Sequence, residues 1–203
     1  MRKVSDVVKA TLAQFLLIVF SVVLGLYLSE RIEERKRVQE ANRLLAVLQS
    51  ELQENRRLLN YWAPYHQEIS ENLDSLSGDA AFLARFLDNK SVLFQDLLTR
   101  GTFMGRMPAS DAWDIAKSHP LIVNIDYDKL IALSKVYNQQ ASTFRPGFEI
   151  SEIYNSKDVN TAENARVNLE LMSDRMREMV AREDQLRVYY SEAGDVLGLD
   201  EEP

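Results

Sequence analysis

The feature that most constrains this chain is an uncharged apolar stretch of twenty residues near its beginning. It runs from Ala10 to Ser29, with Lys9 before it and Glu30 after it. As an α-helix it would be about 30 Å long, which is the thickness of the hydrocarbon core of a bilayer. Tyr27 lies near one end, where an aromatic ring suits the membrane–water interface. The stretch therefore predicts a membrane-spanning helix at 10–29.

Two alternatives to this anchor are a signal peptide that is removed and a helix buried in a soluble core. A signal peptide has a shorter apolar region and a pair of small residues at its cleavage site. Residues 27–30 offer no such pair, and the helical pattern continues beyond them, so cleavage would cut a helix. We therefore expect an uncleaved signal-anchor at 10–29, preceded by a short basic tail at 1–9.

Two sequence rules disagree about the side of the membrane on which the rest of the chain lies. Three basic residues precede the span and five fall in residues 30–44, which favours a cytoplasmic domain. Four glutamates interleave with those five, however, and long domains cross a membrane largely regardless of charge. Because a basic tail followed at once by an apolar segment is how a signal-anchor begins, we expect a single-pass protein of the inner (cell) membrane. Its domain would be periplasmic or extracytoplasmic, in the bacterial envelope.

One side of the predicted span carries small residues at a spacing of four. Ser21, Gly25 and Ser29 form a small-xxx-small pattern, which permits two helices to approach closely. Gln14 lies close to the same line and could form a hydrogen bond across such an interface. The alternative is that small residues are simply common in membrane helices. These four residues are the predicted membrane association face.

Residues 30–62 contain neither Gly nor Pro and predict a continuation of the membrane helix. Apolar residues recur there at alternating gaps of three and four, the heptad pattern of a coiled coil. Leu44, Val47 and Leu58 widen the apolar face, as in a helical bundle. The predicted helix–helix seam consists of Val38, Ala41, Leu45, Leu48, Leu52, Asn55, Leu59 and Trp62.

Between the two ends of the chain, breaker residues predict short helices. Pro64 predicts a break, followed by helices at 65–76, 80–87, 91–100, 110–118 and 126–140, the last ended by Pro146 and Gly147. Asp79 and either Asp126 or Asp128 are predicted N-caps, and 101–108 is a predicted loop. The residues expected to face the core are Trp113, Ile115, Ala116, Leu130, Leu133, Val136 and Tyr137.

A second long helix is predicted near the C-terminus. Asn160 and Glu163 resemble a capping box, from which we expect a helix to about Ala193. Its apolar stripe is interrupted by Glu183, and its members are Ala165, Leu169, Met172, Met176, Met179, Leu186 and Tyr190. The predicted fold is all-α: a transmembrane helix continues into a long amphipathic helix, which packs with short helices and this long C-terminal helix in a bundle at 30–193. Residues 194–203 are predicted to be an acidic flexible tail.

The junction after the span resembles that of a large family of uncharacterised bacterial membrane proteins. Residues 25–37 read GLYLSERIEERKR, whereas in the family a single N-terminal membrane helix runs into a polar stretch of the kind NNWNEERK and then into a long helix. Arg31 stands where the family has Trp. The pair Ala112-Trp113 and the LSKVY of 133–137 are similar to later family positions. The resemblance implies a membrane-anchored helical domain of unknown function, with no catalytic residues to carry over.

Residue types that carry chemistry are sparse. The chain has no cysteine, and neither His66 nor His119 has a metal-binding partner at helical spacing. Residues 101–106 lack the Gly-Lys-Ser/Thr ending of a phosphate-binding loop, and no nucleophilic serine motif is present. We therefore predict no catalytic residue, no cofactor, no metal and no enzyme. The loop from Arg100 to Pro108 mixes apolar and cationic residues, which suits either a partner contact or a plug of the bundle.

Charge and architecture together indicate the class of function. The chain has 24 basic and 31 acidic residues, and removing Arg2, Lys3, Lys9 and Asp6 leaves 21 and 30 after the anchor. An acidic domain argues against binding nucleic acid. We expect a structural or interaction module that contacts membrane lipid and acts as a homo-oligomer or as the accessory subunit of a membrane complex. The alternative is a sensor whose helical domain binds a ligand and signals through a partner protein.

Overall fold

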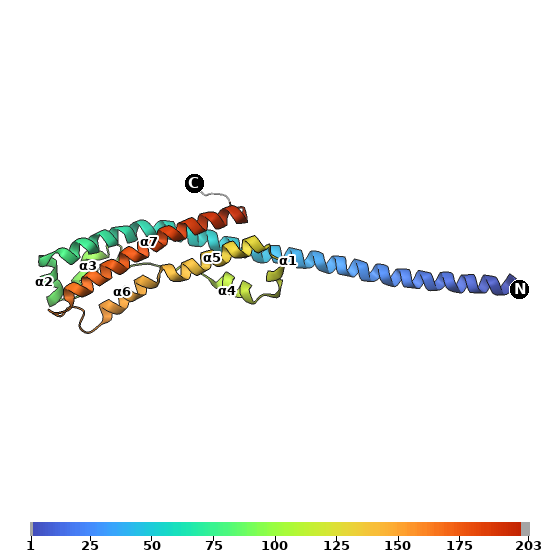
Figure 1. The fold of residues 1–203 in the computed structure, drawn as a ribbon, viewed down its shortest axis with the longest axis horizontal. Coiled ribbons are helices and arrows are strands. Elements are labelled where there is room, and N and C mark those ends of the chain that lie inside the picture. Colours follow the sequence, from blue (N-terminus) through green and yellow to red (C-terminus); the bar gives the residue numbers. More distant parts are fainter. Residues whose placement is uncertain (1, 200–203) are drawn as a thin grey trace.

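The computed structural model describes the backbone of residues 2–199 and the side chains of residues 14–199. Over this range every regular element is a helix and there is no strand, as Figure 1 shows, which confirms the predicted all-α fold class. The elements in chain order are α1 (Arg2–Gly78), α2 (Ala80–Asp88), α3 (Val92–Leu97), α4 (Asp111–Ser118), the 3₁₀ helix η1 (Pro120–Asn124), α5 (Tyr127–Thr143), α6 (Arg145–Asn155) and α7 (Ala165–Leu197).

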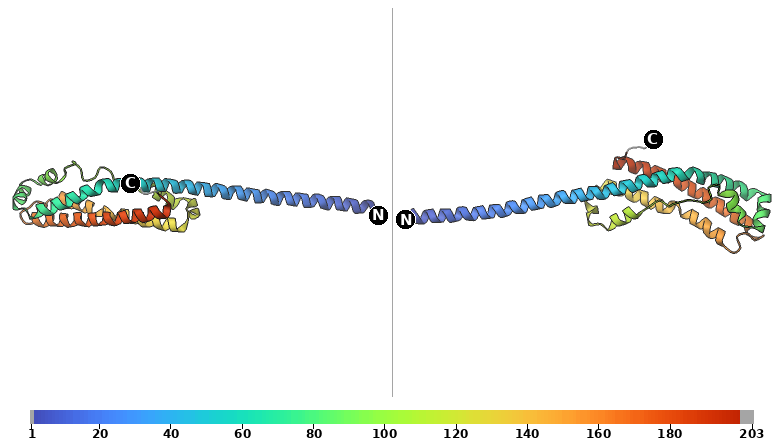
Figure 2. Two further views of the ribbon diagram at one scale, coloured as in Figure 1. Left: turned by 90° about the horizontal axis from the view of Figure 1, so that it is seen from above. Right: turned by 180° about the vertical axis from the view of Figure 1, so that it is seen from behind.

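The N-terminal part of α1 extends away from the bundle as a single helix (Figure 2). All residues from 14 to 40 are exposed, and Ala41 is the first buried residue among the side chains described. Within the described range, α1 is the one helix that is long and apolar enough to cross a membrane. This finding is consistent with a single-pass membrane protein.

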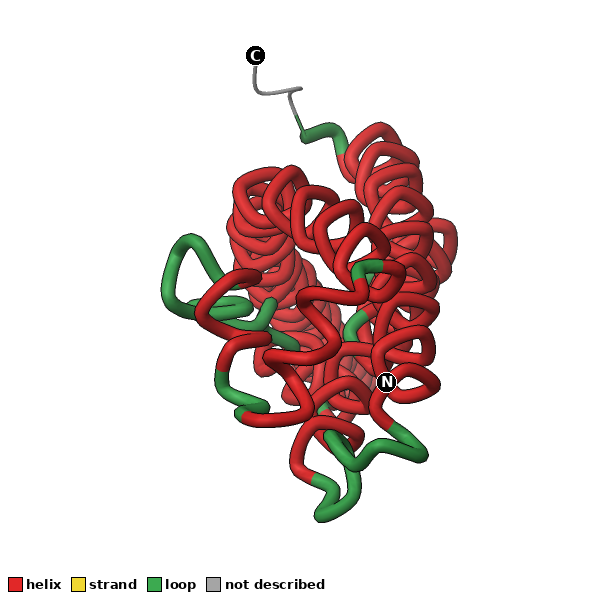
Figure 3. Tube along the Cα trace, turned by 90° about the vertical axis from the view of Figure 1, so that its left-hand side faces the viewer, coloured by secondary structure: helices red, strands yellow, loops and turns green. Residues whose placement is uncertain are grey.

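Helix α7 packs antiparallel to the second half of α1. Three contacts along the two helices show this pairing. Gln49 donates to the carbonyl of Leu197 at 2.9 Å, and Ser173 donates to Asp74 at 3.2 Å. Between them, His66 contacts Glu183. Figure 3 shows the helices of the bundle viewed along the long axis of the molecule. The predicted apolar stripe of α7 lies in the core between them, because all seven of its residues are buried.

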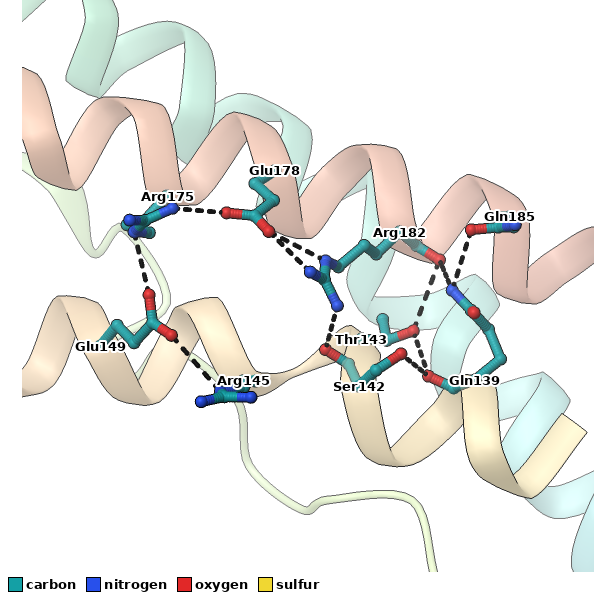
Figure 4. Close-up of polar contacts among 9 residues, drawn as sticks. All are labelled: Gln139, Ser142, Thr143, Arg145, Glu149, Arg175, Glu178, Arg182 and Gln185. Carbon is teal, nitrogen blue, oxygen red and sulfur yellow. Dashed lines mark hydrogen bonds and ion pairs between the residues drawn. The ribbon is translucent and has the colours of Figure 1, made fainter.

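Helices α5 and α6 pack against another side of α7, and Figure 4 shows how polar groups bridge them. Pro146, near the start of α6, has no N–H to donate to the carbonyl of Ser142, four residues earlier. Arg182 of α7 supplies a donor instead, at 3.0 Å from that carbonyl oxygen. Glu149 of α6 is bound by Arg175 of α7 at 2.9 Å. The junction between α5 and α6 is therefore stabilised by α7.

The predicted break at Pro64 is wrong, because α1 continues through it to Gly78. Proline removes the hydrogen bond to the carbonyl of Asn60 but does not force the helix to end. Pro64 and Asn60 are both exposed, so water can solvate that carbonyl. The residues after Pro64 also have buried partners that hold them helical, since Tyr65, Ile69 and Leu73 are almost fully buried.

Three further expectations are corrected. Pro146 and Gly147 do not end a helix but belong to the first turn of α6, where proline is tolerated. Asn160 does not cap α7, which begins at Ala165, because its amide donates to the carbonyls of Phe86 and Leu87 at the end of α2. Helix α7 also continues past the predicted limit to Leu197, where Gly198 adopts a left-handed conformation.

Several local predictions are confirmed. The side chain of Asp79 accepts from the amide of Ala81, and that of Asp126 accepts from two amides at the start of α5. Trp113 and Ala116 of α4 face the core as predicted, whereas Ile115 is 62 % exposed and does not. Ile115 points outward because α4 is short and packs against α1 through one side only.

Candidate functional site

The most unusual group in the bundle is a buried ionisable pair at the centre of the α1–α7 interface. His66 of α1 and Glu183 of α7 are 0 % and 1 % exposed, and His66 Nδ1 lies 2.6 Å from Glu183 Oε1. Charged side chains are rarely buried without a partner, because desolvation of a lone charge is costly. Glu183, which interrupts the apolar stripe of α7, is accommodated there by this contact.

The second nitrogen of the same ring also faces an acceptor. His66 Nε2 lies 3.1 Å from the carbonyl oxygen of Phe103. A neutral imidazole has one donor and one acceptor, so both contacts are satisfied when the ring is protonated or when the carboxyl group of Glu183 donates to Nδ1. In either case the pair holds one proton more than a neutral histidine beside a carboxylate.

Glu183 Oε2 is buried and has no hydrogen-bond partner among the described side chains and backbone groups. Both ring nitrogens of His66 are occupied and the ring is inaccessible. The pair can therefore anchor the Phe103 carbonyl, but it is closed to solvent. Aromatic rings enclose it further: Phe103 stacks on His66 at 4.9 Å between centroids, and Trp62 at 6.2 Å.

The Phe103 carbonyl belongs to the connection between α3 and α4, which we call the 98–110 connection. This irregular segment is fastened along α1 at successive points. The amide of Arg100 donates to the Tyr65 hydroxyl at 3.2 Å, and Arg106 pairs with Glu54 at 2.5 Å. The predicted loop at 101–108 is therefore non-helical, as expected, but it is bound to the surface of α1 over most of its length.

A second polar network fixes the end of this connection. Asn55 Oδ1 accepts from the amide of Ala109 at 2.8 Å, and its Nδ2 donates to the Ala109 carbonyl at 2.7 Å. Gln140 of α5 also donates to that carbonyl, and its Oε1 accepts from the hydroxyl of Tyr190 at 2.7 Å. Asn55 is 1 % exposed, so a buried polar group in the predicted seam binds backbone of the connection.

Two tyrosines near this network lie in water-excluded surroundings. Burial, together with the hydroxyl's bond to the Glu51 carboxylate, raises the pKa of Tyr137 far above its ordinary value. Burial, and to a smaller extent the charge of Glu51, also raises the pKa of Tyr190. Both phenols are therefore neutral hydrogen-bond donors at physiological pH.

Beside the buried pair, the 98–110 connection forms one wall of a cavity of about 250 Å³. The other walls come from α3 and from the junction of α5 and α6. Its lining is apolar apart from two hydroxyl groups, and consists of Phe94, Leu98, Thr102, Phe103, Met104, Met107, Phe144, Gly147, Phe148, Ile150 and Ser151. Phe103 thus connects the two features, since its ring lines the cavity and its carbonyl is held by His66.

The predicted membrane association face and the predicted seam occupy different surroundings. Gln14, Ser21, Gly25 and Ser29 are all exposed on α1, where the Ser21 hydroxyl donates to the carbonyl of Leu17. Most of the seam lies inside the bundle. Ala41, Leu48, Leu52, Asn55, Leu59 and Trp62 are buried, Leu45 is half-buried and Val38 is 52 % exposed.

Among the side chains described, no group of three metal-ligating residues could hold a metal ion. His119 lies apart from His66 and accepts from the amide of Leu121 at the start of η1. The loop from Arg100 to Pro108 plugs the bundle in part, and a partner contact through its exposed side stays a prediction. Phe103 and Met104 pack against the core, while Met107 is 42 % exposed.

The sequence does not predict the His66–Glu183 pair, because the partner of His66 lies on another helix and not at helical spacing along its own. The one available signal was a charged residue inside an otherwise apolar stripe, which indicates a buried counterpart elsewhere. Comparisons of the chain with protein-family models, with curated proteins and with solved structures gave no match. The resemblance of the 25–37 junction to a bacterial membrane family therefore stays a prediction.

Proposed function

We propose that this protein is a non-enzymatic, single-pass membrane protein whose α1 carries a helical interaction domain and associates, through its membrane face, with a second copy or a partner subunit. The observation that carries this proposal is the continuity of α1 from the apolar segment into the bundle. Residues 30–40 form an exposed neck between the two, about 16 Å long. The neck has no glycine or proline that would act as a hinge.

The arrangement of residues around α1 supports association through the small-residue face. Gly25 and Leu52 are seven and a half turns apart at 3.6 residues per turn, so they lie on opposite sides of the helix. Leu52 is 2 % exposed and faces the bundle. A helix that packs against Gly25 therefore approaches the side of α1 away from the bundle, and two copies would carry their bundles on the outside without collision.

Cysteine cross-linking in membranes tests this geometry, since the chain contains no cysteine of its own. Gly25→Cys lies on the small-residue face, and Val23→Cys, on nearly the opposite side of the helix, is the matched control. We expect strong disulfide-linked dimer for Gly25→Cys and weak product for Val23→Cys. Equal cross-linking of both variants, together with a strictly monomeric mass in detergent and no co-purifying partner, would contradict the proposal.

We further infer that the bundle lies outside the cytoplasm, because the basic N-terminal tail followed at once by an apolar segment is typical of a signal-anchor. Reporter domains fused after Pro203 distinguish the two orientations. A periplasmic reporter should be active and a cytoplasmic reporter inactive. The reverse result would place the bundle in the cytoplasm and would leave the association geometry unchanged.

A further inference from the structure

We propose that the cavity between α3, the 98–110 connection and the α5–α6 junction binds a small, uncharged ligand of one or two aromatic rings. The site is built from three separate segments of chain, represented by Phe94, Met104 and Phe148. None of these segments forms the cavity alone, so the site exists only in the folded bundle. The inference stands apart from the proposed membrane association, because that association involves α1 and no residue of α1 lines the cavity.

The volume of the cavity sets the size of the ligand. At about 250 Å³ it is larger than a cavity of about 150 Å³ that accepts benzene. It lies just below the range of about 300–1,000 Å³ typical of drug-sized ligands. A fused or linked pair of aromatic rings suits this volume, whereas a folded helix or strand of a protein partner does not.

The lining sets the chemistry of the ligand. No charged side chain of the described residues lines the cavity, so a charged ligand would lose its hydration without a compensating partner. Aromatic rings and methionine sulfurs interact favourably with aromatic ligands. The Ser151 hydroxyl accepts from Asn155 and donates to no group among the described residues, so it could donate to one acceptor group on the ligand.

The position of the cavity excludes the lipids of the anchoring membrane as occupants. Its wall at Phe103 is fastened to His66, which lies about ten turns of α1, or about 55 Å, beyond Ser29. An acyl chain within the bilayer cannot span that distance. A free, diffusing molecule can enter, because Met107 and Phe148 at the rim are 42 % and 60 % exposed.

Photo-labelling of the full-length protein in detergent tests the site. Benzophenone is uncharged, has two rings and reacts readily with methionine, so mass spectrometry of the labelled peptides reports its position. We expect saturable labelling at Met104 and Met107, competed by 2-naphthol. The anionic analogue 4-benzoylbenzoate should label these residues at least about tenfold less, because the cavity offers no counter-charge.

Variants that fill the cavity provide the control. Thr102→Trp and Ser151→Phe fill it from two different segments of its lining and should each abolish labelling at Met104 and Met107. Thr99→Trp adds the same ring to the same connection outside the cavity and should leave labelling unchanged. Circular dichroism melting of all three variants checks that the bundle is folded, and Ser151→Phe keeps the test valid if Thr102→Trp unfolds.

Three results would overturn the proposal. The first is labelling confined to the apolar segment of α1, which would reflect partition into detergent. The second is labelling that the cavity-filling variants or the anionic analogue do not distinguish. The third is no labelling of Met104 and Met107 in the wild type. If Thr102→Trp then also changes the mass measured by light scattering, a protein surface covers the cavity instead.

Discussion

His66 Nδ1 and Glu183 Oε1 lie 2.6 Å apart in the core, although 117 positions separate them in the chain. The contact joins the two longest helices at the middle of their interface and, through the Phe103 carbonyl, also fastens the 98–110 connection. Three segments of chain therefore meet at one imidazole ring. The consequences for stability can be measured by removing either partner or both.

Removal of one member of the pair is expected to be severe. His66→Ala leaves the Glu183 carboxyl group buried without its partner and the Phe103 carbonyl without its donor, which should lower the free energy of unfolding by about 3–5 kcal/mol. Urea unfolding followed by circular dichroism measures the change. In the double variant His66→Phe/Glu183→Met the buried carboxyl group is gone and, of the groups that the pair satisfied, only the Phe103 carbonyl lacks its partner, so part of the loss should be recovered. A double variant less stable than His66→Ala would contradict this account.

Asn55 is expected to stabilise the end of the 98–110 connection. Asn55→Ala removes the acceptor for the Ala109 amide and one donor to its carbonyl, which should cost about 1–3 kcal/mol. Hydrogen exchange at the Ala109 amide should also become faster. Asn60→Ala, at an exposed position of the same helix, is the matched control and should change stability by less than about 0.5 kcal/mol.

Glu178 gives the bundle a specific dependence on pH. Hydrogen bonds from Arg182 and then Arg175 hold the pKa of its carboxyl group below the ordinary 4.5. A lower pKa in the folded state means that the contribution to stability is present above pH 4.5 and is lost as the pH falls below it. The stability difference between the wild type and Glu178→Gln should therefore be largest at neutral pH. It should be under about 1 kcal/mol, because these side chains are partly exposed, and it should disappear in acid.

Helix α4 provides a test of which residue faces the core. Ile115 is 62 % exposed, so Ile115→Gln should change the free energy of unfolding by less than about 0.5 kcal/mol. The adjacent Ala116 is fully buried, and Ala116→Leu should be destabilising by about 1–3 kcal/mol through overpacking. A larger effect of Ile115→Gln than of Ala116→Leu in thermal or urea unfolding would contradict the observed orientation of α4.

The parts of the fold that follow from local patterns were predictable. Asp79 and Asp126 cap helices as expected, because an N-cap depends only on the amides two or three residues away. The apolar stripe of α7 is buried as expected, because helical spacing places its residues on one side. Such features require no knowledge of distant segments.

The predictions that failed depended on distant partners. Pro64 was expected to end a helix, yet the core contacts of Tyr65 and Ile69 keep the chain helical beyond it. Asn160 was expected to cap α7, yet it binds the end of α2, more than 70 positions earlier. The candidate site could not be predicted for the same reason. His66 and Glu183 lie on different helices, so the residue pattern along either helix does not identify the other partner.

The number of residues in the neck of α1 sets the height and the rotation of the bundle. With α1 inserted in a bilayer as proposed, each neck residue would raise the bundle by about 1.5 Å above the membrane and rotate it by about 100° about the helix axis. Deletion of seven neck residues would lower the bundle by about 10 Å and keep almost the same side towards a neighbouring helix. Deletion of two would lower it by only about 3 Å but rotate that side by about 200°, so that the bundles of two associated copies would face one another. A change in the length of the neck therefore alters the rotation of the bundle about the helix axis more than it alters the height of the bundle.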